Sequence, residues 1–188
     1  MFPFLSLFVQ IFLGKIMSNP VQKELIEGVV LKPLKKLCDE RGFLMEILRS
    51  DWLEFEKFGQ CYITVCNPDT AKAWHYHKNQ ADHFAVLNGK AKVVLYDARK
   101  DSKTFQKINE FVMSLDEPFL LKIPKLVFHG FTPIGSSSAT ILNIPTQLYN
   151  YSKPDEFRRP FNWNGINYDW GTSKGDLKST EEEEKRQL

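Results

Sequence analysis

Short runs in which apolar and polar residues alternate dominate the middle of this 188-residue chain. In the run from Cys61 to Cys66, Tyr62, Thr64 and Cys66 share one face and the intervening residues share the other, the two-residue period of a half-buried strand. Further β-rich runs follow at near-even spacing, at 84–87, 91–96, 111–113, 119–123, 127–131 and 140–144. Many short strands separated by turn residues are typical of an all-β sandwich or barrel.

Local signals refine this pattern. Asn88-Gly89 stands between two β-rich runs and is the strongest hairpin signal in the chain, so it predicts that the flanking strands pair. A β-rich stretch at 29–37 precedes DERGFLMEIL, which opens with a turn and continues as a strand. Segment 51–58 is expected to form a short helix, and the polar segments at 67–70 and 97–104 are expected to be loops.

The two ends of the chain differ from its middle. Residues 1–16 are almost wholly apolar but too short to span a bilayer, and they lack the basic start of a signal peptide. We interpret 1–16 as a mis-assigned start before Met17, with a signal-like anchor or a packed extension as alternatives. The predicted organisation is an N-terminal extension (1–27), a single domain (28–170) and a polar, disordered tail (171–188).

Composition narrows the class of protein. A net charge of +2 is too small to indicate a nucleic-acid or membrane partner, and 43% hydrophobic residues suit one ordinary folded domain. Three cysteines without a CxxC motif are expected to be reduced thiols in a cytoplasmic protein.

Histidine and aspartate residues mark the candidate site. His75 and His77 are two residues apart, so a strand places both imidazoles on one face. Together with Asp82 and His129 they are expected to converge inside the barrel. This donor set suits a divalent Zn, Mn, Fe, Co or Ni ion, and the spacing does not choose among these metals. A metal-free catalytic pocket made from the same residues is the alternative.

The spacing of these residues resembles the two motifs of the cupin superfamily. The first is HxH followed by an acidic residue and a glycine, and the second is the segment from Pro124 to His129, in which Leu126 stands where glycine is usual. The resemblance implies an all-β cupin double-stranded β-helix, a single-domain jelly-roll barrel.

A closer resemblance covers residues 28–170. The segments DERGFLMEI, AKAWHYH, IPKLVFHGF and YNYSKPDE are similar to the dTDP-4-dehydrorhamnose 3,5-epimerase family. The resemblance implies that His75 is the general base, Arg41 binds the nucleotide diphosphate, Glu46 contacts the nucleoside and His129 lines the sugar pocket. It also implies a homodimer and no required cofactor.

Several positions depart from the family pattern. Lys72 stands where the family has a phosphate-binding arginine, Asp82 where it has a pocket lysine, and Asn143 where it has a catalytic tyrosine. Tyr149 and Tyr151 are the expected substitutes for that tyrosine.

The remaining candidate site residues are assigned roles without a sequence motif of their own. Asp169 is the carboxylate expected to partner the base, and Gln60, Lys72 and Asn143 are expected to bind substrate. If the histidines hold a metal, Tyr76, Tyr149 or Tyr151 would serve as base.

These observations favour an isomerase or epimerase of a nucleotide-linked 4-keto-deoxysugar, in the synthesis of surface-polysaccharide precursors. Its partner would be the sugar nucleotide, with no nucleic acid and no membrane. The alternatives are a non-catalytic cupin that binds a sugar nucleotide and a metal-dependent cupin enzyme of other chemistry.

Overall fold

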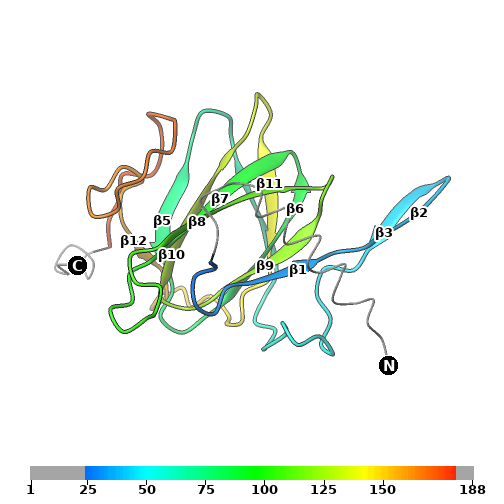
Figure 1. Cartoon of the computed structure of the whole chain (residues 1–188), viewed down its shortest axis with the longest axis horizontal. Helices are drawn as coiled ribbons and strands as arrows, with labels where there is room; N and C mark the ends of the chain where they lie inside the picture. Colours follow the sequence, from blue (N-terminus) through cyan, green and yellow to red (C-terminus); the bar gives the residue numbers. More distant parts are fainter. Residues whose placement is uncertain (1–23, 181–188) are drawn as a thin grey trace.

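Two five-stranded antiparallel sheets form the body of the protein in the computed structural model, which describes residues 24–180 (Figure 1). The first sheet has the order β1 (Val30–Pro33), β9 (Phe119–Ile123), β6 (Asp82–Asn88), β11 (Ala139–Asn143) and β4 (Tyr62–Cys66). The second has the order β12 (Phe157–Arg158), β5 (Lys72–Tyr76), β10 (Val127–Pro133), β7 (Lys90–Asp97) and β8 (Ile108–Ser114). The predicted all-β jelly roll is thus confirmed.

The core lies between the two sheets because alternate residues of each strand face inward. Phe84 and Ile141 from the first sheet meet Val93, Leu95 and Phe131 from the second, and all five are buried. Ile26, expected in the N-terminal extension, is buried in the same core.

Both outer faces are partly covered. On the second sheet, an outer cluster that includes Trp74 and Tyr76 packs against Phe161, Ile166 and Trp170 from the C-terminal segment. On the first sheet, Leu34, Ala85 and Leu120 are covered by residues 45–52. Burial on both faces explains why several strands are apolar along their whole length instead of alternating.

The strands beside Asn88-Gly89 do not form the predicted hairpin. Gly89 adopts a positive φ of 73°, as a tight turn requires. However, β6 pairs with β9 and β11, whereas β7 pairs with β10 and β8. The chain therefore bends at Gly89 and passes from one sheet to the other, so the prediction that the flanking strands pair is wrong.

A separate hairpin projects from the body of the molecule. It consists of β2 (Lys36–Asp39) and β3 (Gly42–Met45), which pair with each other around the turn expected in the DERGF segment (Figure 1). Leu37, Phe43 and Leu44 are 51%, 50% and 59% exposed on this hairpin.

The helix expected at 51–58 is not formed; residues 51–54 form turns, and 55–58 have no regular secondary structure. Eight residues are too few for a stable helix without packing, and the side chains are instead held individually. The ring of Trp52 packs on the first sheet under the Lys32 ammonium, and Glu54 and Glu56 pair with Lys32 and Lys122.

The disorder expected for 171–188 does not hold for residues 171–180. Gly175 forms a β-bridge with Ala71, and Asp176 pairs with Arg158. Residues 1–16 and 181–188 lie outside the described residues. Within 24–180, no helix has the length and apolar character to cross a membrane.

Candidate active site

The four residues expected to converge lie together inside the barrel. One donor atom from each of His75, His77, Asp82 and His129 lies within 4.8 Å of the others. Asp82 Oδ2 is 3.3 Å from His77 Nε2 and 3.2 Å from His129 Nε2. The carboxylate therefore lies between two imidazoles, with the His75 ring 4.1 Å from that of His129.

Strand pairing explains this arrangement. His75 in β5 is the direct partner of His129 in β10, and a register shift follows between His129 and Phe131. Because side chains alternate across a strand, His75 faces the barrel interior whereas Trp74 and Tyr76 face the outer cluster. Tyr76 is 1% exposed and stacks on Phe157. It is therefore wrongly placed to act as the base.

The electrostatics favour a neutral His75. Burial, reinforced by His129 and His77 beside it, holds the pKa of His75 well below its usual value. Burial also opposes charge on His77, but the Asp82 carboxylate outweighs it and raises the pKa of His77. Burial would raise the pKa of Asp82, yet the charge of His77 and hydrogen bonds from His129 and His77 lower it well below the usual range. The site thus combines an ionised carboxylate with an imidazole able to accept a proton.

Asn143 connects this cluster to a tyrosine. Its buried amide Nδ2 donates to Asp82 Oδ1 at 3.0 Å and to the Tyr62 hydroxyl at 2.8 Å. Burial, followed by the nearby Asp82 charge, raises the pKa of Tyr62 to about 12. Tyr62 is therefore a neutral phenol at physiological pH.

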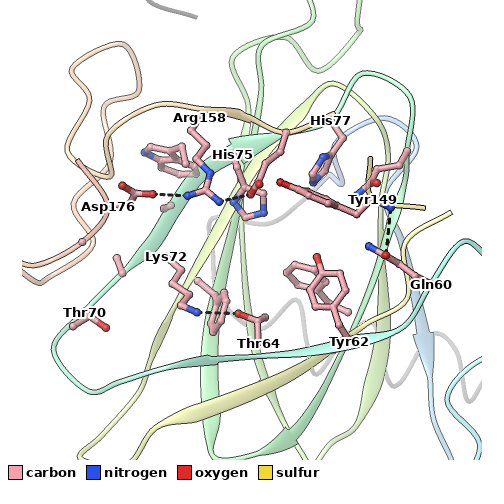
Figure 2. A pocket seen from close by; sticks show the side chains of 18 of the residues that line it. Gln60, Tyr62, Thr64, Thr70, Lys72, His75, His77, Tyr149, Arg158 and Asp176 are labelled. Carbon is pink, nitrogen blue, oxygen red and sulfur yellow. Dashed lines mark hydrogen bonds and ion pairs between the residues drawn. The ribbon is translucent and has the colours of Figure 1, made fainter. Parts of the chain in front are cut away.

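A pocket of about 1140 Å³ opens beside the cluster (Figure 2). Its lining includes six residues named from the sequence: Gln60, Lys72, His75, His77, Tyr149 and Tyr151. Asp82, His129 and Asn143 lie behind the lining, buried at 1% exposure each. The volume suits a drug-sized or nucleotide-sized ligand.

One side of the pocket consists of residues that sequence reasoning missed. Arg158 in β12 pairs with Glu156 and Asp176, each at 2.9 Å, and all three line the pocket together with Lys174 (Figure 2). The YNYSKPDE segment, which ends in Glu156, was the available signal. We call residues 171–180 the C-terminal wall.

Three expected site residues lie elsewhere. Arg41, with an 82% exposed side chain, pairs with Asp39 on the projecting hairpin, and Glu46 pairs with Arg49 just beyond it. Asp169 is exposed and accepts a hydrogen bond from the Gly171 amide. None of the three lines the pocket, because the hairpin extends away from the barrel and Asp169 lies beside the outer cluster. That Asp169 partners the base stays a prediction, although in this structure its carboxylate does not line the pocket.

A jelly roll with imidazoles at the base of an open pocket defines a cupin-type barrel with a small-molecule site. A profile of the dTDP-4-dehydrorhamnose 3,5-epimerase family matches residues 23–185. The chain belongs to this family, as the sequence predicted.

Individual relatives and solved structures support this family membership. The chain is 42% identical to the spore coat polysaccharide biosynthesis protein SpsL of Bacillus subtilis, over 79% of this chain and 98% of that protein. It is 38% identical to a probable low-salt glycan biosynthesis epimerase, Agl13, of Haloferax volcanii, over 77% of this chain and 94% of that protein. A dTDP sugar isomerase from Desulfovibrio desulfuricans superposes with a TM-score of 0.74 at 31% identity, over 81% of this chain and 95% of that chain.

Proposed function

We propose that this protein epimerises a nucleotide-linked 4-keto-deoxysugar during the synthesis of surface-polysaccharide precursors. Family membership and the glycan-biosynthesis relatives support the reaction class. The observation that carries the proposal is His75, a neutral imidazole that lines an open, nucleotide-sized pocket.

The chemistry required is modest. A carbon next to the sugar ketone loses its proton to His75 Nε2 or Nδ1, and the C–H electrons form an enolate. A proton then returns to the opposite face of the same carbon. Because no electrons leave the substrate, the reaction needs no redox cofactor. Stabilising the enolate is the harder half, and each well-placed donor contributes roughly 3–4 kcal/mol.

Cations on one side of the pocket suit a diphosphate. Lys72, which donates to Thr64 Oγ1 at 3.1 Å, and Arg158 both line the pocket. A guanidinium binds phosphate oxygens in a bidentate manner. We assign the nucleotide diphosphate to these two residues, with Gln60, Tyr149 and Tyr151 lining the same pocket around the remainder of the substrate.

We propose a homodimer, in which Arg41 and Glu46 could contact the substrate bound to the partner subunit. Exposed Leu37, Phe43 and Leu44 lie on the projecting hairpin, and β1 is the edge strand of the first sheet among residues 24–180. In the proposed dimer, this hairpin reaches the partner subunit and presents Arg41 to its pocket. Light scattering at micromolar concentration should give a dimeric mass, and Leu44→Glu should give a monomer. A monomeric wild type would contradict the proposal.

A divalent metal is the second candidate. The three imidazoles and one carboxylate match a transition-metal donor set. Asp82 Oδ2 and His129 Nε2 are buried, and the only polar atoms near them in the part of the chain that the structure describes belong to the cluster itself, with His129 Nε2 3.2 Å and His77 Nε2 3.3 Å from Asp82 Oδ2, so both atoms fit as ligands. A bound ion would polarise the sugar ketone as a Lewis acid. Elemental analysis and titration with Zn, Mn, Fe, Co and Ni salts test this; a protein that binds none of them with micromolar affinity has no such site.

A cytoplasmic location agrees with the free cysteines. Cys38 and Cys61 are exposed and unpaired thiols, a state that reducing compartments favour. Cell fractionation with an antibody to the chain tests the location.

The reaction is tested by incubating dTDP-4-keto-6-deoxyglucose with the protein in deuterated water. We expect deuterium at C3 or C5, and His75→Ala should abolish its uptake. Asp82→Lys separates the two candidates: it removes a metal ligand but adds a cation, so loss of exchange favours the metal and increased exchange favours the metal-free base. A wild type that binds the sugar nucleotide but exchanges neither proton would be a binding module instead.

A further inference from the structure

We propose that Tyr62 is the catalytic acid that returns the proton to the sugar from the face opposite His75. This inference rests on the proposed epimerase function and names the second proton-transfer group. It replaces the expectation that Tyr149 or Tyr151 has this role.

Tyr62 and His75 approach the pocket from opposite walls. Tyr62 lies on β4 at the edge of the first sheet, and His75 lies on β5 in the second sheet, which faces it across the barrel. Both side chains line the same pocket, and Figure 2 shows the Tyr62 ring pointing toward the space below His75 and Tyr149. A flat enolate between them would have one group on each face, as inversion of a carbon requires.

Hydrogen bonding fixes the direction of the Tyr62 hydroxyl proton. The Asn143 Oδ1 accepts the backbone N–H of His83 at 3.2 Å, and Asn143 Nδ2 donates to the Asp82 carboxylate. A backbone N–H can only donate and a carboxylate can only accept, so the orientation of the Asn143 amide is determined. Asn143 Nδ2 must therefore also be the donor to Tyr62. The Tyr62 oxygen accepts, and its own O–H remains available to the pocket.

The strand register places Asn143 beside Tyr62. Asn143 and Tyr62 are direct partners in the β11–β4 pairing. Asn143 is 1% exposed, so it provides a fixed anchor for the phenol. By contrast, Tyr149 and Tyr151 lie in the segment after β11, where their rings contact each other at 5.0 Å.

The step balances without another reactant. His75 takes the proton from one face of the carbon, leaving the enolate. The Tyr62 O–H bond then breaks and a new C–H bond forms on the other face, while the enolate electrons restore the ketone. The Tyr62 phenolate takes a proton from water and the His75 imidazolium gives one to water, so both groups return to their starting states.

The test is Tyr62→Phe in deuterated water with dTDP-4-keto-6-deoxyglucose, measuring solvent exchange and the inverted sugar separately. We expect exchange through His75 to stay within about tenfold of wild type, while the inverted product falls by roughly 10²–10⁴-fold, the usual contribution of a general acid. Tyr168→Phe, which removes the same hydroxyl from the outer aromatic cluster, should change neither rate. A melting curve for each variant establishes that it is folded.

Two results would overturn the role of Tyr62 while the epimerase function stands. One is inverted product at the wild-type rate in Tyr62→Phe. The other is an equal fall of exchange and inversion in a folded variant, which indicates that Tyr62 positions the substrate or the base. If the wild type neither exchanges nor inverts, the proposed function fails, and the role of Tyr62 fails with it.

Discussion

Gly130 lies so close to Ala73 that a Cβ on Gly130 would stand 2.3 Å from the Ala73 Cβ and 2.7 Å from the Lys72 carbonyl oxygen. The contact is between β10 and β5, at the register shift that follows His129. A residue without a side chain is required for β5 to approach this closely. Gly130 thereby allows the His75 and His129 rings to lie side by side.

We therefore expect Gly130→Ala to lower the free energy of unfolding by about 1–3 kcal/mol, the usual effect of overpacking. It should also reduce proton exchange at the sugar, because β5 moves together with His75. Chemical denaturation measures the first effect. Adding Ala73→Gly removes the atom in closest contact and should recover part of the stability; no recovery at all would show that this contact is not the cause.

Leu126 provides a second backbone test. Its φ of 66° is left-handed, at the position where the second cupin motif usually has glycine. Leu126→Ala and Leu126→Gly both remove the side chain, but the glycine also removes about 1 kcal/mol of backbone strain. We expect the glycine variant to be more stable than the alanine variant, the reverse of the order usual in helices and strands. Thermal or chemical unfolding of the pair measures this, and the opposite order would contradict it.

Asp97 should make stability depend on acid pH. Burial would raise its pKa, but hydrogen bonds from Arg99, Ser102 and Thr104 lower it to about 2. Because the folded pKa lies below the unfolded value, the ionised carboxylate stabilises the fold above pH of about 4, and this stabilisation is lost as the pH falls toward 2.

Asp97→Asn should accordingly lower the free energy of unfolding by about 1–3 kcal/mol at neutral pH. This difference in stability from wild type should shrink as the pH falls from about 4 to about 2. Asp101→Asn, an exposed change in the loop that follows β7, is the matched control and should have little effect. A deficit that stays constant with pH would exclude the ionised Asp97 as its source.

Arg158 is expected to bind the diphosphate. Arg158→Gln should weaken binding of dTDP by roughly 10–100-fold, since hydrogen bonds to a charged group contribute about 1.5–3 kcal/mol. Isothermal titration measures the affinity. Lys153→Gln, which removes a positive charge from an exposed residue outside the pocket lining, should bind dTDP as the wild type does. Equal affinity in Arg158→Gln would place the diphosphate elsewhere.

The sequence was most informative where a period or a spacing has one geometric meaning. Two histidines two apart on a strand must share a face, so His75 and His77 were placed correctly. The prediction that the strands beside Asn88-Gly89 pair was wrong for a different reason. The dipeptide indicates only a local change of chain direction, whereas long-range packing decides which strands pair.

Other site residues could not be predicted from local signals. Arg158 lies in a two-residue strand, which is too short to produce a period. The sequence grouped Tyr62 with Thr64 and Cys66 on one strand face, but the importance of Tyr62 depends on Asn143, eighty-one residues away in the chain. Asp169 was chosen for its proximity in sequence to a family motif, and the chain turns it to the outside.

The C-terminal wall meets the rest of the protein through the bridge of Ala71 to Gly175 and through a few hydrogen bonds and ion pairs, which include those of Asp176 and Thr180 with Arg158 and that of Thr172 with the Asp69 carbonyl. Residues that shape the ligand site can therefore be exchanged without altering any strand of the double sheet. Grafting this ten-residue segment between relatives would be a direct way to change which sugar nucleotide is accepted, and an affinity tag would be better placed at a distance from it.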